Sequence, residues 1–242
     1  MVVTATSRSA LGSAMADPII VLSDVIRVYR EADVETIALR GVDLEVAPGE
    51  FVAIMGRSGS GKSTLLQLLS GSDRPTAGRV MVDGLDLSRA SEDERARLRG
   101  RHVGIVFQSH NLVPFLSLEE NVVLSSVLAG RPVDRSTARQ SLVRVGLAGR
   151  AGHRPDQLSG GEQQRAALAT VLVTRPPIVL ADEISGELDS ENAALLLGLL
   201  EEVHSADAMT LVLATHDPSV AGRADRLVEL RDGRIVSDRR LR

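Results

Sequence analysis

The chain of 242 residues contains no cysteine and no tryptophan, and only one of its 28 basic residues is a lysine. Without cysteine it cannot form disulfides or thiolate metal sites, which fits a reducing cytosol. No apolar run reaches the roughly 18 residues of a membrane-spanning helix, so the sequence predicts that the chain itself does not cross a membrane. A net charge of −4 provides no overall positive field for nucleic acid or an anionic membrane surface, and no nucleic-acid partner is expected.

The rest of the composition favours one globular domain. With 43% apolar residues, the chain is long enough to bury a substantial core. Residues 1–17 are rich in Ser, Thr and Ala and lack the unbroken apolar core of a signal peptide, so we expect a disordered N-terminal tail. The folded domain is therefore expected to comprise residues 18–242.

From Pro18 onward, short apolar runs alternate with helical patterns. Residues 18–30 and 36–46 are typical of strands, and Pro48-Gly49-Glu50 is the turn that follows them. Three further runs are typical of short buried strands: 51–55, 178–182 and 210–215. Alternation of such strands with helices predicts an α/β fold with a mostly parallel sheet.

Two capping-box patterns predict where helices begin. Ser91 is followed three residues later by Glu94, and Ser117 by Glu120. The first of these helices carries acidic residues early and arginines late, as the helix dipole favours.

The segment GRSGSGKST contains the single lysine and fits the pattern Gly, four residues, Gly-Lys-Ser/Thr. It lies between a predicted strand and a predicted helix, where glycines let backbone N–H groups surround phosphate at the positive end of the helix. The compact ammonium of Lys62 is expected to contact the outer phosphates, because the wide planar guanidinium of arginine would not fit this narrow loop. Ser63 is the expected Mg²⁺ ligand. The predicted phosphate site consists of Gly56, Arg57, Ser58, Gly59, Ser60, Gly61, Lys62, Ser63 and Thr64.

A second segment, LSGGEQQR at 158–165, places Ser159, Gly160 and Gly161 at the start of a helical run. This arrangement builds another anion-binding helix terminus. Two phosphate cradles with no second lysine indicate that each cradle completes its site with a partner molecule. At this point the sequence resembles the ATP-binding subunit of ABC transporters, over residues 19–237. In that family the second segment contacts the γ-phosphate of the ATP held by the opposite subunit.

The resemblance implies a fold, cofactors and partners. The implied fold is a P-loop NTPase (RecA-like) core with a mostly parallel sheet, an antiparallel β subdomain and an ABC-specific α-helical subdomain at roughly 109–165. ATP and Mg²⁺ are the implied cofactors, with ATP hydrolysis coupled to transport. The implied partners are a second copy of the chain, or a close paralogue, and an integral membrane permease subunit. The chain would then be cytoplasmic and peripheral on the inner face of the membrane.

The resemblance also assigns roles to residues outside the two cradles. In IVLADE, two acids end an apolar strand, which is costly unless they are paired or metal-bound. By resemblance, Asp182 would hold Mg²⁺ through water and Glu183 would orient and polarise the attacking water. His216, in ATHD, resembles the switch histidine that touches the γ-phosphate. Gln108 matches the Q-loop residue that links the metal to the membrane partner.

Tyr29, the only tyrosine, matches the aromatic residue that stacks on adenine, with core packing as the alternative. Asp189 corresponds to the loop that crosses between the two sites of the dimer. Two positions depart from the family pattern. Ile184-Ser185 stands where the family usually has Pro-Thr, and Thr170 stands where it usually has arginine. Every catalytic group is retained, so hydrolysis is still expected, and the departures bear on its rate.

Flanking residues indicate a subfamily and a docking surface. VFQSHNLVPFLSLEENV and RPDQLSGGEQQR look most like the subfamily of lipoprotein release and macrolide export. Residues 108–115 are the expected docking surface for the membrane partner, with the apolar side chains of Leu112, Val113, Phe115 and Leu116 partly exposed.

ABC-type ATPases of DNA repair, chromosome structure and translation are disfavoured by three absences. The sequence has no coiled-coil insertion between the two cradles, no cysteine for zinc and no second ATPase domain. A non-transporting ATPase that mechanically regulates a membrane or cell-wall partner stays open as the alternative.

Overall fold

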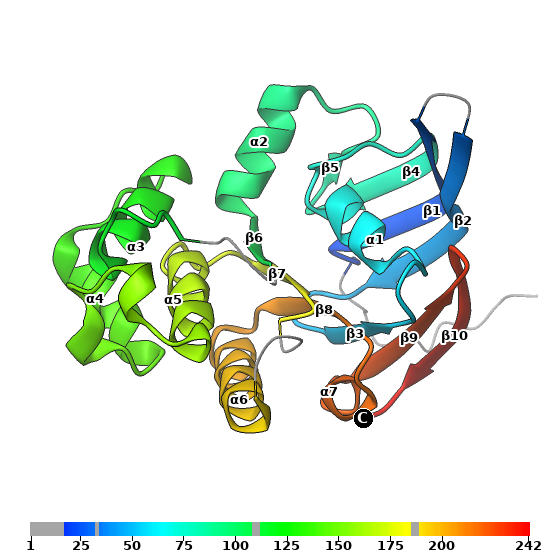
Figure 1. The fold of residues 1–242 in the computed structure, drawn as a ribbon. Helices are drawn as coiled ribbons and strands as arrows, with labels where there is room; N and C mark the ends of the chain where they lie inside the picture. Colours follow the sequence, from blue (N-terminus) through cyan, green and yellow to red (C-terminus); the bar gives the residue numbers. More distant parts are fainter. Residues whose placement is uncertain (1–16, 32–33, 108–111, 185–188) are drawn as a thin grey trace, which may run out of the picture.

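The computed structural model describes residues 17–31, 34–107, 112–184 and 189–242. Almost all of the expected N-terminal tail therefore lies outside the described residues, as do Gln108 and Ser185. In the described part of the chain, two sheets lie beside a group of helices (Figure 1).

The central sheet has six strands in the order β10-β9-β3-β8-β7-β6. Neighbouring strands are parallel from β6 through β7, β8 and β3 to β9, and only β10 is antiparallel to its neighbour. The strands are β3 (Phe51–Met55), β6 (Val103–Val106), β7 (Ile178–Asp182), β8 (Thr210–Thr215), β9 (Arg226–Arg231) and β10 (Arg234–Arg240). The expected mostly parallel sheet is confirmed.

Strands β3, β7 and β8 are buried on both faces, which explains why they are almost continuously apolar in sequence. Successive side chains of a strand point to opposite faces. On β3, Phe51 and Ala53 belong to one buried cluster with the helices, while Val52 and Ile54 belong to a second cluster with the antiparallel sheet. The parallel sheet is thus the layer that separates the two halves of the core.

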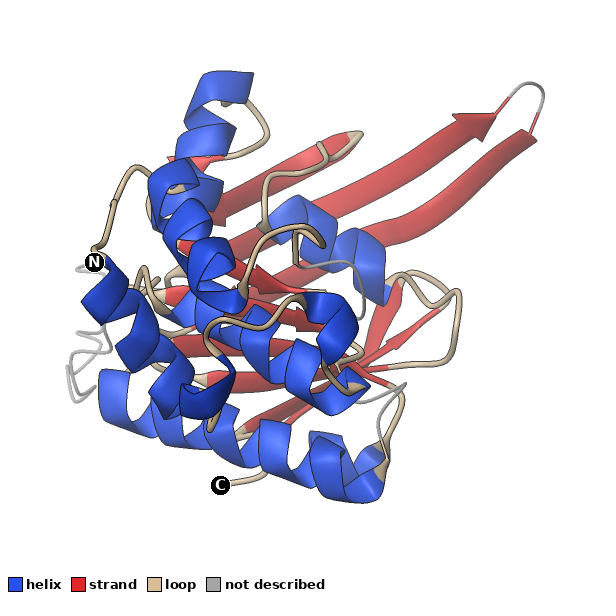
Figure 2. Cartoon of the chain, turned by 60° about the vertical axis from the view of Figure 1, so that its left-hand side comes forward, coloured by secondary structure: helices blue, strands red, loops and turns tan. Residues whose placement is uncertain are grey.

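The second sheet is antiparallel, in the order β2-β1-β4-β5. Its strands are β1 (Ile20–Glu31), β2 (Val34–Val46), β4 (Ala77–Val82) and β5 (Leu85–Asp86). The first two are the longest strands and run side by side, as Figure 2 shows. Alternate residues of β1 and β2, such as Ile20, Leu22 and Leu44, pack into the cluster that also contains α1 side chains. The expected antiparallel strands are present.

Helices connect the strands and cover the parallel sheet. They are α1 (Lys62–Leu69), α2 (Glu92–Arg101), α3 (Leu118–Leu128), α4 (Arg135–Arg144), α5 (Gly160–Leu172), α6 (Ser190–Asp207) and α7 (Pro218–Ala221), with short 3₁₀ helices η1 (Ala148–Arg150) and η2 (Pro155–Gln157). Both predicted capping boxes are confirmed: Ser91 pairs with Glu94 at the start of α2, and Ser117 with Glu120 at the start of α3. Ser159 and Glu162 form another at the start of α5.

Helices α3, α4 and α5 gather at the end of the molecule away from β1 and β2 (Figure 1). The proposed limit of a helical subdomain at residue 165 falls within α5, which continues to Leu172. The division into subdomains therefore stays a prediction. Among the described residues, no helix combines the length and the apolarity needed to cross a membrane.

Candidate functional site

The glycine-rich loop joins the end of β3 to the start of α1, as predicted. Gly59 and Gly61 have φ values of 77° and 106°, which side chains with a Cβ rarely adopt. At Gly56 a Cβ would come within 2.4 Å of the Leu230 carbonyl oxygen and of Ser60 Oγ. The loop conformation therefore requires glycine at these positions.

A cavity of about 450 Å³ opens over this loop. It is lined by the loop, the start of α1, the end of β7 and the edge of the antiparallel sheet. The lining residues are Tyr29, Thr36, Ile37, Ala38, Ser58, Gly59, Ser60, Gly61, Lys62, Ser63, Thr64, Asp182 and Glu183. Gly56 and Arg57 line a neighbouring cavity of about 700 Å³ together with His216.

Lys62 is the buried cation of the site, with 5% of its side chain exposed. Its Nζ donates to the carbonyl oxygens of Gly56 at 2.9 Å and Arg57 at 3.3 Å. It also lies 3.1 Å from Glu183 Oε1. The ammonium is therefore held among three acceptors at the base of the loop, which a planar guanidinium could not reproduce.

Asp182, the last residue of β7, and Glu183, which follows it, have pKa shifts of opposite direction. Burial raises the pKa of Asp182, and the negative charge of Glu183 adds to the effect. Partial burial alone would raise the pKa of Glu183 too, but the hydrogen bond and charge of Lys62, with the charge of His216, hold that pKa below its ordinary value. Glu183 also has a positive φ of 46°. The structure thus keeps Glu183 ionised and disfavours the ionised form of Asp182.

The residues present fit a Mg²⁺–nucleotide complex. Ser63 hydrogen bonds to Asp182, yet Asp182 Oδ1 and Ser60 Oγ are buried without a protein partner. Among the described residues, no group of three His, Cys, Asp or Glu side chains forms a metal cage of its own. Mg²⁺ is typically held by one or two protein ligands together with substrate phosphates and water. Ser63 and Asp182 are suitable protein ligands for such an ion.

His216 follows β8 and lies near the carboxylate oxygen of Glu183 that Lys62 does not contact. Its Nδ1 lies 3.5 Å from Glu183 Oε2, and 61% of its side chain is exposed. The sequence placed Glu183 and His216 some 30 residues apart. Parallel pairing of β7 with β8 brings them together at the carboxyl edge of the sheet.

The second cradle, Ser159 to Gly161, lies at the start of helix α5. Ser159 caps α5 by accepting from the Glu162 backbone N–H at 3.3 Å. A Cβ at Gly161 would lie 2.4 Å from Asn192 Oδ1, so glycine is needed where α5 meets α6. Asp189 caps α6 by accepting from the Asn192 backbone N–H at 2.9 Å, which lowers the Asp189 pKa. None of the described residues lining the cavity over the loop comes from 159–161 or from Asp189.

The profile of the ABC transporter family matches residues 39–186, which is more than half of the chain. The chain belongs to the ABC transporter family. Among curated relatives, the macrolide export ATP-binding/permease protein MacB of Hyphomonas neptunium is 48% identical over 226 residues, covering 93% of this chain and 35% of that protein. The pyoverdine export ATP-binding/permease protein PvdT of Pseudomonas entomophila is 46% identical, with 93% and 35% covered. The chain thus spans about a third of the length of these relatives.

Solved structures agree with this family assignment. A dimeric post-hydrolysis state of the ATP-binding cassette MJ0796, bound to ADP and Pi, superposes with a TM-score of 0.86 at 38% identity, covering 92% of this chain and 99% of that chain. CbiO1 of Clostridium perfringens, part of the ABC transporter complex cbiONQ, gives a TM-score of 0.81 at 28% identity, with 93% and 90% covered. The expected resemblance to an ATP-binding cassette of the ABC ATPase class, and its fold, are confirmed.

Several cassette positions have surroundings that the sequence did not indicate. Thr36, Ile37 and Ala38 line the cavity from β2, because strand pairing brings β2 over the loop. No sequence signal marks these residues, since their side chains carry no distinctive chemistry.

The two positions that depart from the family pattern are buried. Ile184 fills the core and is 1% exposed. Thr170 is buried, and its Oγ1 donates to the Ala167 carbonyl oxygen at 2.7 Å.

The expected docking segment of the cassette is only partly described. Gln108 lies outside the described residues, so its role stays a prediction. Phe115 is 70% exposed, whereas Leu112 packs against the core cluster and is half-buried. Val113 and Leu116 are also half-buried. The four apolar residues are thus exposed to different degrees, and Phe115 is the one that faces solvent.

Proposed function

We propose that this cassette binds and hydrolyses MgATP as the motor of an ABC transporter, in which two copies bind two ATP molecules between them and drive a membrane permease. The observation that carries the proposal is the separation of the two cradles. The cavity over the loop contains Lys62, Ser63 and Glu183, while Ser159 caps a different helix outside it. A second copy placed head to tail would supply the missing cradle.

The residues of the cavity support defined roles in hydrolysis. Lys62 and the N–H groups of the loop would bind the outer phosphates at the positive end of α1. Mg²⁺, held through Ser63 and Asp182, would neutralise charge on the phosphate oxygens. Glu183, kept ionised by its surroundings, would accept a proton from the attacking water, and His216 would contact the γ-phosphate. The second cradle of the partner copy, Ser159 to Gly161, would close over that phosphate.

A membrane partner is supported by the names of the relatives, which combine ATP-binding and permease functions. A groove of about 390 Å³ between α2, β6, α3 and α5 supports the proposal that the permease docks here. Val113 lines this groove, and the exposed Phe115 follows two residues later. We assign docking of the permease to this side of the cassette, which would place the cassette at the inner face of the membrane. Export, which the names of these relatives state for macrolides and for pyoverdine, is the corresponding finer proposal.

Mixing two inactive variants tests the shared site. Lys62→Ala removes the loop cation, and Ser159→Arg blocks the second cradle, so each variant alone should lose ATP hydrolysis. A mixed dimer contains one intact site, formed by Lys62 of one copy and Ser159 of the other. An equimolar mixture should therefore recover up to about a quarter of the wild-type sites. A mixture as inactive as its components would show that each chain completes its own site.

A further inference from the structure

Tyr29 is held by its neighbours on two sides. The Arg27 guanidinium lies 4.3 Å from the centroid of the Tyr29 ring. The phenolic hydroxyl donates to Asp73 Oδ2 at 2.9 Å and lies 3.4 Å from Gln67 Oε1. Arg27 Nε donates to the same Asp73 oxygen at 2.7 Å. One carboxylate therefore holds both the aromatic ring and the cation that covers it.

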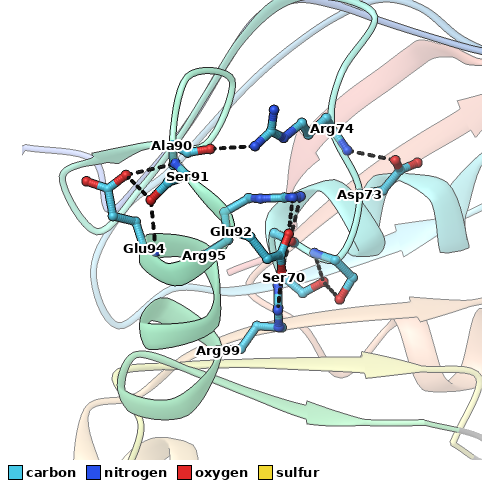
Figure 3. A network of polar contacts seen from close by, with 11 residues as sticks. Ser70, Asp73, Arg74, Ala90, Ser91, Glu92, Glu94, Arg95 and Arg99 are labelled. Carbon is cyan, nitrogen blue, oxygen red and sulfur yellow. Dashed lines mark hydrogen bonds and ion pairs between the residues drawn. The ribbon is translucent and has the colours of Figure 1, made fainter.

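The carboxylate itself lies on a rigid loop. The Asp73 backbone N–H donates to the Gln67 carbonyl oxygen at 3.2 Å, which ties it to α1. Two arginines of α2, Arg95 and Arg99, donate to the Gly71 carbonyl oxygen in the same loop, and Figure 3 shows them below Asp73 and Arg74. Arg74 in turn donates to the Ala90 carbonyl oxygen at 2.9 Å (Figure 3). Asp73 is thus fixed relative to the glycine-rich loop through α1.

One face of the ring is covered and the other is available to the cavity. Tyr29 lines the cavity over the loop, whereas Arg27 and Asp73 are not among the described residues that line it. Their side chains are only 22% and 21% exposed. A planar base in the cavity can therefore stack on the ring face that Arg27 leaves open, and stacking requires that the ring keep one orientation.

We propose that Arg27 and Asp73 are positioning residues for the nucleotide base: together they fix the Tyr29 ring so that its open face receives adenine. The inference rests on the proposed binding of ATP in this cavity. Because Asp73 is tied to α1, the same contact fixes the distance between the base site and the phosphate site. The contribution of the two residues should therefore appear for ligands with a base and be absent for phosphate chains alone.

The experiment measures two ligands and one spectroscopic signal on the full chain. MgATP and magnesium tripolyphosphate are titrated calorimetrically against wild type, Arg27→Gln, Arg27→Lys and Asp73→Ala. Because the chain has one tyrosine and no tryptophan, tyrosine emission reports Tyr29 alone, and Tyr29→Phe supplies the blank. Arg30→Gln is the matched control, since Arg30 pairs with Glu35 at 2.8 Å in the same hairpin without contacting the ring.

We expect Arg27→Gln and Asp73→Ala to raise the Kd for MgATP about three- to tenfold, because misalignment forfeits part of the stacking. Their Kd for tripolyphosphate should stay within about twofold of wild type. Tyrosine anisotropy in the nucleotide-free protein should fall in both variants and be unchanged in Arg30→Gln. Arg27→Lys, which keeps a cation at the ring, should recover most of the MgATP affinity.

Three results would overturn the inference. Wild-type MgATP affinity in both variants would show that the ring needs no positioning, and the proposed function would stand. Equal loss of affinity for MgATP and tripolyphosphate would show that Arg27 and Asp73 stabilise the structure in general and do not position the base. Binding of neither ligand by wild type would refute the proposed function and this inference together. If Asp73→Ala does not fold, Arg27→Gln and Arg27→Lys decide the question by the same measurements.

Discussion

Replacing Glu183 by glutamine separates two effects of one carboxylate. Glu183 Oε1 lies 3.1 Å from Lys62 Nζ, the same ammonium that is proposed to bind phosphate. Incoming phosphate must therefore compete with this carboxylate. Glu183→Gln keeps the shape of the side chain and removes its charge, so it should weaken the competition and abolish the proton acceptor at once.

The size of the expected change in Kd follows from how far the Lys62–Glu183 ion pair is exposed to solvent. Glu183 is 26% exposed, so solvent screens the ion pair and its net contribution is about 1 kcal/mol, below the 3–5 kcal/mol of a fully buried pair. Removing that competition should lower the Kd for a nonhydrolysable MgATP analogue about fivefold. Loss of the general base should lower kcat by a factor of about 10² to 10⁴.

The assay combines calorimetric titration of the analogue with phosphate release from MgATP. Glu201→Gln is the matched control, because Glu201 is 34% exposed and is likewise paired with a cation, Arg223, but lies on helix α6. Light scattering should show an MgATP-bound dimer of Glu183→Gln. Turnover within threefold of wild type would refute the role of Glu183 as proton acceptor. An unchanged Kd would show that the ion pair does not oppose binding.

The other predictions concern the site lysine, the buried aspartate and the docking side. Lys62→Arg should reduce MgATP affinity and turnover at least about tenfold, because a guanidinium cannot occupy the position among three acceptors; near-normal values would contradict this geometry. Asp182→Asn should raise the Tm of the protein without nucleotide by about 2–4 °C at neutral pH, because it removes the cost, about 1 kcal/mol, of ionising a partly buried carboxyl group. Because the pKa of Asp182 is raised in the folded state, ionising this group lowers the free energy of unfolding as pH rises above its ordinary pKa of 3.8. The gain in Tm from Asp182→Asn should therefore vanish below that pH. A gain in Tm that does not depend on pH would show that the charge of Asp182 is not its cause. Phe115→Ser should leave the free energy of unfolding within about 0.5 kcal/mol of wild type while reducing co-purification with the permease. Leu112→Ser should lower the free energy of unfolding by about 1–2 kcal/mol, because Leu112 packs against the core. If denaturant unfolding shows the reverse pattern, Phe115 is not part of the docking surface.

Local features of the fold were predictable because they depend on neighbouring residues in the chain. The pairing of Ser91 with Glu94 follows from a spacing of three residues in one helical turn. The buried strand at Phe51–Met55 follows from a continuous apolar run. The division of that run between two clusters, one with the helices and one with the antiparallel sheet, requires knowing what packs on each face.

The sequence by itself determined the family, the phosphate-binding loop and the chemical identity of the site residues, because glycine, lysine and serine at fixed spacing can form few other structures. Only the tertiary structure decided how these residues interact. Parallel pairing of β7 with β8 brings His216 to 3.5 Å from Glu183, and the turn before α1 brings Lys62 to its other oxygen. Folding of β1 against the loop after α1 joins Tyr29, Arg27 and Asp73 over sequence separations of 44 and 46 residues. Contacts of this kind depend on the relative placement of whole elements, which is set by burial of both faces of the sheet and is not encoded in any short segment.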